Sequence, residues 1–233
     1  MRERTVVLSR PSIRPITAAV DVVLLTPRDS SLAVLLLRTD ARARDRWMLP
    51  WDAPRADESP DDAALRIARA VLGNAPAALE QVAAFGDSRR HPGDAQLSIS
   101  FVGLVPHDIS AASTEAVSWV DVGELPVLAP RHRAIVDAAV ESVRRRIDQS
   151  PLAFRLLPPS FTLSELQSVY ELLLGRRLHK ASFRRALQAA FLVEPIEEWR
   201  SEGRGRPAQL YRYAPRRRRG PRRGVRFDLF NAD

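Results

Sequence analysis

The segment from residue 161 to residue 213 constrains the fold most, because it contains the start and end signals of a helix pair. Thr162 and Glu165 have the spacing of a capping box, in which each side chain satisfies a free backbone amide at a helix start. Gly175 suits the left-handed position that ends a helix. Between these signals runs an apolar stripe at helical spacing, formed by Leu166, Val169, Tyr170 and Leu173.

A second helical pattern runs from about residue 180 to residue 191. One face of this helix is apolar and consists of Phe183, Leu187, Ala190 and Phe191. The opposite face has the chemistry to enter a DNA groove and consists of Ala181, Arg184, Arg185 and Gln188. Strand-like runs follow at 192–194, 196–200 and 210–213, with a basic loop before the last one. This order of elements is that of a winged helix-turn-helix.

We therefore expect this region to bind double-stranded DNA, through ten side chains. Ser182, Arg184, Arg185 and Gln188 are expected to face the major groove, and Arg176, Arg177 and Lys180 to hold phosphates. Arg204 and Arg206 at the wing tip are expected to reach a minor groove or the backbone, with Arg200 beside them. The alternative is a small α+β domain with solvated arginines, and the placement of the basic residues argues against it. A homodimer on a palindromic operator is expected, since two-fold proteins bind two-fold sites.

The same segment closely resembles the C-terminal DNA-binding domain of the Nudix-related transcriptional regulators (NrtR-type). The resemblance covers about fifty residues with little gapping. Its first part comprises Phe161-Thr162-Leu163, Glu165-Leu166-Gln167 and Tyr170-Glu171. Its second part comprises Leu174-Gly175-Arg176, Leu178, Lys180, Phe183-Arg184-Arg185, 203–207 and Leu210-Tyr211-Arg212.

Charge is distributed unevenly along the chain. From Pro151 onward there are 17 Lys and Arg against 8 Asp and Glu, whereas the preceding part is almost neutral. A polyanionic partner for the C-terminal part follows. The absence of cysteine excludes thiol catalysis, disulfides and thiolate-bound zinc, and fits a cytoplasmic location. The apolar run 16–25 is too short to span a membrane and contains Asp21, so no membrane partner is expected.

The N-terminal part is predicted to be an α/β sandwich, a mixed sheet flanked by helices, and the resemblance to the NrtR-type regulators implies that this sandwich is Nudix-like. Strands are expected at 16–25, 32–37, 79–85, 96–105 and 116–122, and helices at 59–72 and 130–147. The first helix has clear start signals in Ser59-Pro60 and an end signal in Gly73. We expect a ligand-sensing domain over 1–129, a linker helix over 130–150, the winged helix-turn-helix over 151–215 and a basic tail over 216–233.

The segment 52–73 resembles the Nudix box, a motif that runs Gly, five residues, Glu, seven residues, Arg-Glu-apolar-any-Glu-Glu-any-Gly. Glu58, Arg66 and Gly73 match this spacing without a gap, and Asp52 replaces the opening glycine. The three glutamates of the metal-binding helix are replaced by Ile67, Ala70 and Val71. Apart from the resemblance, the segment reads as an amphipathic helix with an ordinary Glu58–Arg66 ion pair.

These replacements bear on catalysis, because Mg²⁺ and Mn²⁺ need clustered oxygen ligands. Ile67, Ala70 and Val71 offer none, so we expect no enzyme activity, no bound metal and no required cofactor. The four histidines, His91, His107, His132 and His179, show no metal-binding spacing. A nucleotide hydrolase with a nucleic-acid-binding module and an RNA-binding adaptor are the rival function classes.

The resemblance implies a ligand-responsive transcriptional regulator, commonly a repressor of NAD synthesis, whose effector is ADP-ribose, NAD or ATP. The damaged box is also similar to that of the NadQ-type regulators, which respond to adenine nucleotides; a sugar effector is the alternative. The expected effector contacts are Arg38, Trp47, Glu58, Arg66, Arg89 and Arg90. The arginine-rich tail over 216–233 is expected to add sequence-independent attraction to DNA phosphates, unless it is simply a solvated tail.

Overall fold

The computed structural model describes residues 15–28, 30–39, 47–106, 114–147, 150–201 and 207–214. A seven-stranded mixed sheet forms the N-terminal part. Its strands have the order β3-β2-β1-β6-β5, with β4 paired to β1 and β7 paired to β2. β1 runs parallel to β6, and the remaining pairs are antiparallel. The strands are β1 (Ala18–Arg28), β2 (Ser31–Arg38), β3 (Trp47–Met48), β4 (Trp51–Asp52), β5 (Ala78–Phe85), β6 (Leu97–Leu104) and β7 (Val117–Asp121).

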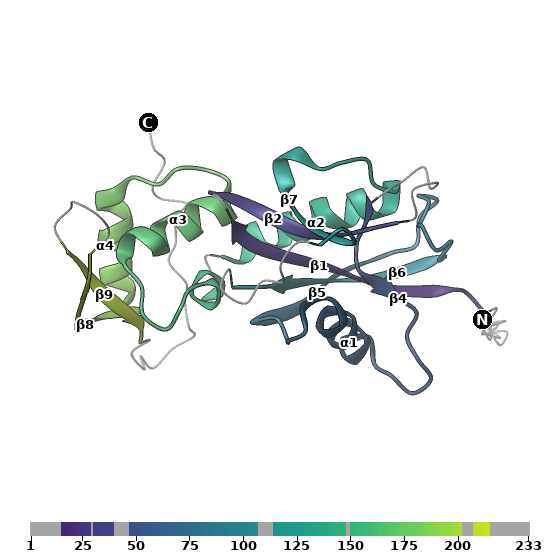
Figure 1. The fold of residues 1–233 in the computed structure, drawn as a ribbon, viewed down its shortest axis with the longest axis horizontal. Coiled ribbons are helices and arrows are strands. Elements are labelled where there is room, and N and C mark those ends of the chain that lie inside the picture. The colour runs from purple at the N-terminus through teal and green to yellow at the C-terminus, as the bar shows by residue number, and fades with distance from the viewer. Residues whose placement is uncertain are drawn as a thin grey trace, which may run out of the picture.

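One helix covers each face of this sheet, α1 (Pro60–Leu72) and α2 (Pro130–Arg146), as Figure 1 shows. The alternation of side chains along β1 explains the two layers. Val20, Val22 and Leu24 belong to the apolar cluster on the α1 side, whereas Val23 and Leu25 belong to the cluster on the α2 side. The predicted α/β sandwich is therefore confirmed, with a short turn of helix, η2 (Val122–Glu124), before α2.

The C-terminal part has the elements of a winged helix-turn-helix. After η3 (Leu152–Leu156) come α3 (Leu163–Leu174), α4 (Lys180–Ala190), β8 (Val193–Arg200) and β9 (Ala208–Tyr213), the last two forming an antiparallel hairpin. The predicted capping box is present in both directions, because Thr162 Oγ1 accepts from Glu165 N and Glu165 Oε2 accepts from Thr162 N. A cluster of aromatic rings fills the interior, made of Phe154, Phe161, Tyr170, Phe183 and Tyr213.

The two parts share one continuous apolar cluster. Val143 and Ile147 on the sheet side belong to the same cluster as Phe154, Leu166 and Tyr170 of the winged helix. Figure 1 shows the sheet domain and the winged helix side by side along the long axis of the molecule. The helix predicted as a linker is therefore packed at the sheet and also joined to the C-terminal core.

Two expectations differ from the structure. The predicted runs 192–194 and 196–200 form a single strand, β8, with an irregular register between Pro195 and Trp199. Proline lacks an amide donor and interrupts the pairing, but it does not end a strand at a sheet edge. Phe191 is not on the apolar face of α4, since it caps the helix in the left-handed conformation with φ 52° and is 41% exposed.

Each helix in the described ranges is too short or too polar to cross a lipid bilayer. Arg204, Arg206 and the basic tail lie outside the described residues, as does His107.

Candidate DNA interface and effector site

The exposed face of α4 carries the side chains predicted to read DNA. Phe183 and Leu187 are buried and fix the rotation of the helix, so that the opposite face points to solvent. The predicted contacts on that face are exposed: Lys180, Arg184, Arg185 and Gln188. Ser182 is half-buried, and its hydroxyl lies 3.2 Å from His179 Nδ1. The positive end of the helix dipole adds to the attraction for phosphates near Lys180.

A polar network holds the turn between α3 and α4. Glu171 Oε1 accepts hydrogen bonds from Leu178 N and from Gln167 Nε2, each at 2.9 Å. Gln167 Nε2 also donates to Leu178 O at 2.9 Å. Burial works to raise the pKa of Glu171, but the hydrogen bonds from Leu178, Gln167 and Arg177 outweigh it and lower that pKa. These contacts give Gln167 and Glu171 a physical role in the motif that the sequence analysis did not assign.

The other predicted DNA contacts differ in their exposure and in the partners that they bind. Arg177 has a side chain that is 92% exposed and one ion pair, from Nη1 to Glu171 Oε2 at 3.0 Å. Arg200 is half-buried, and its Nη1 donates to Glu165 Oε1 at 2.7 Å. Arg200 therefore connects the wing to the capping box of α3 in the protein without DNA. Contact between DNA and Arg176, Arg177 or Arg200 remains a prediction.

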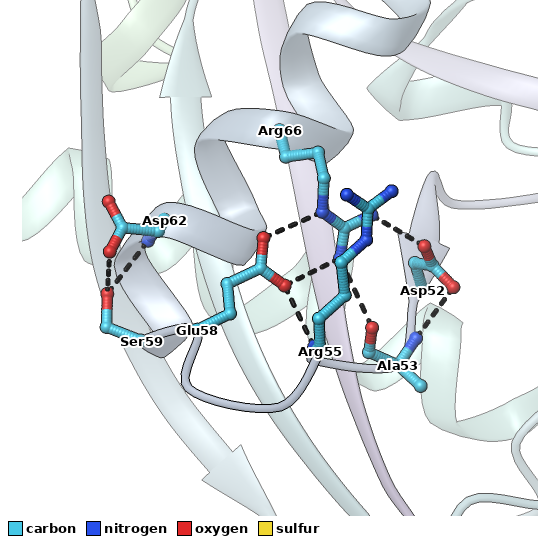
Figure 2. A network of polar contacts seen from close by, with 7 residues as sticks. All are labelled: Asp52, Ala53, Arg55, Glu58, Ser59, Asp62 and Arg66. Atoms are coloured by element: carbon cyan, nitrogen blue, oxygen red, sulfur yellow. Dashed lines mark hydrogen bonds and ion pairs between the residues drawn. The ribbon is translucent and has the colours of Figure 1, made fainter.

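The Nudix-box residues of the sheet domain form an ion-pair cluster between α1 and β4. Figure 2 shows the guanidinium of Arg66 between two carboxylates, with Nε 2.7 Å from Glu58 Oε1 and Nη1 2.6 Å from Asp52 Oδ2. Glu58 Oε2 also accepts from Arg55 N at 2.9 Å. The hydrogen bonds from Arg66 and Arg55 lower the pKa of Glu58 to about 2. Asp52, at the position of the family's glycine, thus becomes a second partner of Arg66.

The positions of the lost metal ligands are occupied by apolar side chains with three different surroundings. Ile67 is 5% exposed and belongs to the apolar cluster between α1 and the sheet, and Val71 packs against that cluster. Ala70 faces solvent. The carboxylates of Glu58 and Asp52 are both bound to Arg66. The helix that would hold a metal in a Nudix hydrolase contributes to the hydrophobic core in this chain.

The six predicted effector contacts lie in three separate groups. Arg38 and Trp47 are paired across β2 and β3, with the guanidinium carbon of Arg38 6.0 Å from the ring centroid of Trp47. Glu58 and Arg66 lie on the α1 side. Arg89 and Arg90 lie in the loop 86–96 and line an open hollow of about 440 Å³. Effector binding by each group remains a prediction.

A buried cluster in the interior was missed by the analysis of histidine spacing. Asp21 on β1, His91 in the loop 86–96 and His132 on α2 meet on the α2 side of the sheet. Asp21 Oδ1 lies 3.0 Å from His91 Nε2 and 2.9 Å from His132 Nε2. No sequence pattern signals this cluster, because the three residues come from distant elements.

The donor and acceptor roles in these hydrogen bonds show whether the cluster suits a cation. Leu49 N donates to His132 Nδ1 at 3.1 Å, and Gly93 N donates to His91 Nδ1 at 3.0 Å. Each Nδ1 is thus an acceptor, so the proton of each neutral ring is on Nε2 and points to Asp21. A metal-bound histidine has the opposite arrangement, since its second nitrogen donates to an acceptor. The cluster is therefore built as a hydrogen-bonded brace and does not suit a cation.

Comparison with known proteins gives matches over both parts of the chain. The NUDIX domain family matches residues 15–139, and the NrtR DNA-binding winged helix domain family matches residues 153–213. The chain is 29% identical over 205 residues to the ADPR responsive transcriptional repressor NtrR of Acinetobacter baylyi, covering 84% of this chain and 81% of that protein.

Solved structures are also similar over most of the chain. Shewanella oneidensis NrtR complexed with a 27mer DNA is 30% identical, with a TM-score of 0.74, over 85% of this chain and 94% of that one. A MutT/nudix family protein from Enterococcus faecalis is 21% identical, with a TM-score of 0.68, over 86% of this chain and 89% of that one, which is a likeness of fold alone.

Proposed function

We propose that this chain, which belongs to the NrtR family of Nudix-related transcriptional regulators, is a DNA-binding repressor whose affinity for its operator changes when an adenine nucleotide binds the Nudix-like domain. The observation that carries the proposal is the exposed basic face of α4, which is joined through α2 to a Nudix-like domain without its metal-binding carboxylates. The NrtR of Shewanella oneidensis, similar over most of its length, has been crystallised with DNA.

ADP-ribose is the effector that we propose first. The relative from Acinetobacter baylyi is described as ADPR responsive. The loop 86–96 contributes Arg89 and Arg90 to an open hollow, and guanidinium groups suit the paired phosphates of such a nucleotide. NAD and ATP share the adenine and phosphate groups and are tested beside it. By analogy with the resemblance, we propose that the controlled genes belong to NAD synthesis.

We also propose that the Nudix-like domain does not hydrolyse its ligand. Hydrolysis in this fold needs a metal held by clustered carboxylates, and α1 has Ile67, Ala70 and Val71 at those positions. Incubation with ADP-ribose and Mg²⁺ or Mn²⁺, followed by chromatography for AMP, tests this point. Metal-dependent formation of AMP at a rate above that of a protein-free control contradicts it.

The repressor proposal is tested by fluorescence anisotropy with DNA from upstream of the chain's own gene and of NAD-synthesis genes. A salt concentration of about 150 mM weakens nonspecific charge binding, so a preference over random DNA is visible. We expect specific binding that changes on addition of ADP-ribose. Equal binding to random DNA contradicts the proposal, and specific binding unaffected by ADP-ribose, NAD and ATP directs the search to sugars.

The assembly that we propose is a cytoplasmic homodimer on a palindromic site. A symmetric dimer presents two copies of α4 to successive major grooves about one helical turn apart. Light scattering of the free protein and of its DNA complex measures the number of chains in each. A single chain on the operator contradicts this assembly.

A further inference from the structure

The first turn of α2 holds the loop 86–96, which carries Arg89 and Arg90. Arg131 donates to this loop three times: Nη1 to Ala95 O at 2.5 Å, Nη2 to Asp87 O at 2.6 Å and backbone N to Arg90 O at 3.2 Å. Its side chain is almost completely buried, and its Nη2 lies 4.0 Å from Asp87 Oδ1. Burial of a guanidinium is costly unless its donors are satisfied. Among the described residues Nε of Arg131 has no hydrogen-bond partner, whereas Nη1 and Nη2 hold the two sides of one loop.

His132, the next residue of α2, attaches the same loop to the sheet. His132 and His91 both donate to Asp21 Oδ1, so the helix, the loop and β1 meet at one carboxylate. Close backbone packing adds to this attachment, since a Cβ at Gly93 would come within 2.1 Å of the Trp51 ring. A displacement of the loop therefore involves the first turn of α2.

The opposite end of α2 contacts the turn of the helix-turn-helix. Val143 and Ile147 lie in the apolar cluster that also contains Leu166 and Tyr170 of α3. The guanidinium of Arg144 lies against Gly175, where a Cβ would approach Nη2 to 2.7 Å. Gly175 ends α3 with φ 69°, and the predicted phosphate contacts Arg176 and Arg177 follow it directly.

Open space lies beside this contact. A cavity of about 680 Å³ separates the β1–β2 turn from the end of α3, and residues lining it include Ser31, Asp121, Arg144, Glu171 and Arg177. A helix of 17 residues is about 25 Å long and does not compress. A rigid helix of this kind can transmit a shift from one end to the other, and one side of the far junction is open.

We infer that Arg131 is a positioning residue that couples effector binding at the loop 86–96 to the DNA-binding turn through α2, with Arg144 as the contact at the far end. The inference rests on the proposed function, because it takes the effector to bind at Arg89 and Arg90. The coupling factor is the ratio of the DNA dissociation constants measured with and without ADP-ribose. DNA changes the dissociation constant for ADP-ribose by the same factor.

The test measures this coupling factor for the full-length protein and three variants. Arg131→Met keeps the length of the side chain and removes its donors, and Arg144→Ala removes the contact with Gly175. Arg133→Ala is the matched control, because Arg133 is on the same helix but exposed and paired with Asp137. DNA dissociation constants with and without saturating ADP-ribose come from anisotropy, the ADP-ribose dissociation constant from calorimetry, and Tm checks folding.

We expect the coupling factor to fall at least about fivefold toward unity in Arg131→Met and in Arg144→Ala, and to stay at the wild-type value in Arg133→Ala. A merely structural role would lower Tm and leave the factor unchanged in molecules that remain folded. If Arg131→Met does not fold, Arg144→Ala decides the matter, since Arg144 is exposed.

Two failures are distinguishable. A wild-type protein whose specific DNA binding does not respond to ADP-ribose contradicts the proposed effector and with it this inference. A wild-type response that persists at full size in folded Arg131→Met and Arg144→Ala contradicts the coupling role alone.

Discussion

His132 Nε2 lies 2.9 Å from Asp21 Oδ1, and both side chains are fully buried although they are 111 positions apart in the sequence. Burial works to raise the pKa of the Asp21 carboxyl, but the hydrogen bonds from His132 and His91 outweigh it and lower that pKa to about 2. Burial lowers the pKa of His132 and keeps its ring neutral, even though Asp21 opposes this effect. The brace thus joins the Asp21 carboxylate to a neutral His132 ring and, by a second hydrogen bond, to His91.

Asp21→Asn is expected to lower the free energy of unfolding by about 1.5–3 kcal/mol at pH 7, since a hydrogen bond to a charged acceptor contributes that much. Urea unfolding measures the change. Asp137→Asn is the matched control, because Asp137 is an exposed carboxylate on α2 paired with Arg133, and an exposed pair contributes less than about 1 kcal/mol. Equal losses in the two variants contradict a special role for Asp21.

The difference in the free energy of unfolding between wild type and Asp21→Asn should depend on pH with a defined sign. Asp21 titrates near 3.8 in the unfolded chain and at about 2 in the folded one. Its contribution is therefore complete above pH 3.8 and is lost as the pH falls from 3.8 toward 2. His132 adds a separate effect, because its lowered pKa means that the unfolded chain takes up a proton first, so stability falls as the pH drops below 6.5. The difference between wild type and Asp21→Asn should shrink only in the lower range.

Zinc is expected to leave the protein unchanged, although Asp21, His91 and His132 offer three ligand atoms close together. Both Nδ1 atoms accept from backbone amides, and coordination at Nε2 would leave each of them facing a donor. Long-range ¹H–¹⁵N spectra should place the proton of both rings on Nε2. A rise in Tm with added Zn²⁺, together with loss of those two Nε2–H signals, contradicts this assignment.

Local signals explain why so much of the fold was predictable. Helix ends depend on a few neighbouring residues, so the capping box of Thr162 and Glu165 and the left-handed glycines at positions 73 and 175 were visible in the sequence. Apolar runs predicted the strands of the sheet, and apolar stripes at helical spacing predicted the helices. Phe191 was misplaced because periodicity continues through a helix end that no glycine marks.

Contacts between distant elements were not predictable in the same way. Asp21 looks like an interruption of an apolar strand, and Arg131 looks like a solvated residue at a helix start. Their partners are set by how α2 and the loop 86–96 lie on the sheet, which no spacing rule contains. The six expected effector contacts come from separate segments of the sequence, and the structure places them in three groups for the same reason.

Arg185→Ala is expected to weaken binding to the specific operator by about 1–3 kcal/mol if its guanidinium contacts a base edge. Its exposure on the face of α4 opposite Phe183 and Leu187 is the reason for choosing it. Anisotropy titrations with operator and random DNA at equal salt separate the two kinds of contact. An equal loss on both DNAs would make Arg185 a phosphate contact instead.

Arg69→Ala provides the reference for that experiment, because Arg69 is an exposed arginine on α1 in the other domain. It removes the same charge without touching α4. A loss of affinity as large as that of Arg185→Ala would mean that net charge, not position on α4, determines DNA binding.

Glu171→Ala is expected to weaken DNA binding without removing a DNA contact. The carboxylate accepts from Leu178 N, Gln167 and Arg177, and these contacts hold the turn that precedes α4. Its loss leaves the Leu178 amide without that acceptor, at a cost of about 1–3 kcal/mol in the free energy of unfolding. The lowered pKa of Glu171 adds a pH signature, since its contribution is present above pH 4.5 and is lost as the pH falls below that value.

Arg177→Ala tests the charge of Arg177 separately from the structure of the turn. The Arg177 side chain is 92% exposed, so its removal should leave the free energy of unfolding unchanged within about 0.5 kcal/mol. If Arg177 holds a phosphate, the slope of log affinity against log salt should fall by about 1.

Glu171→Ala should lower both stability and affinity. If it lowers neither, the network of Glu171 is not what positions α4, and the apolar contacts of Phe183 and Leu187 suffice.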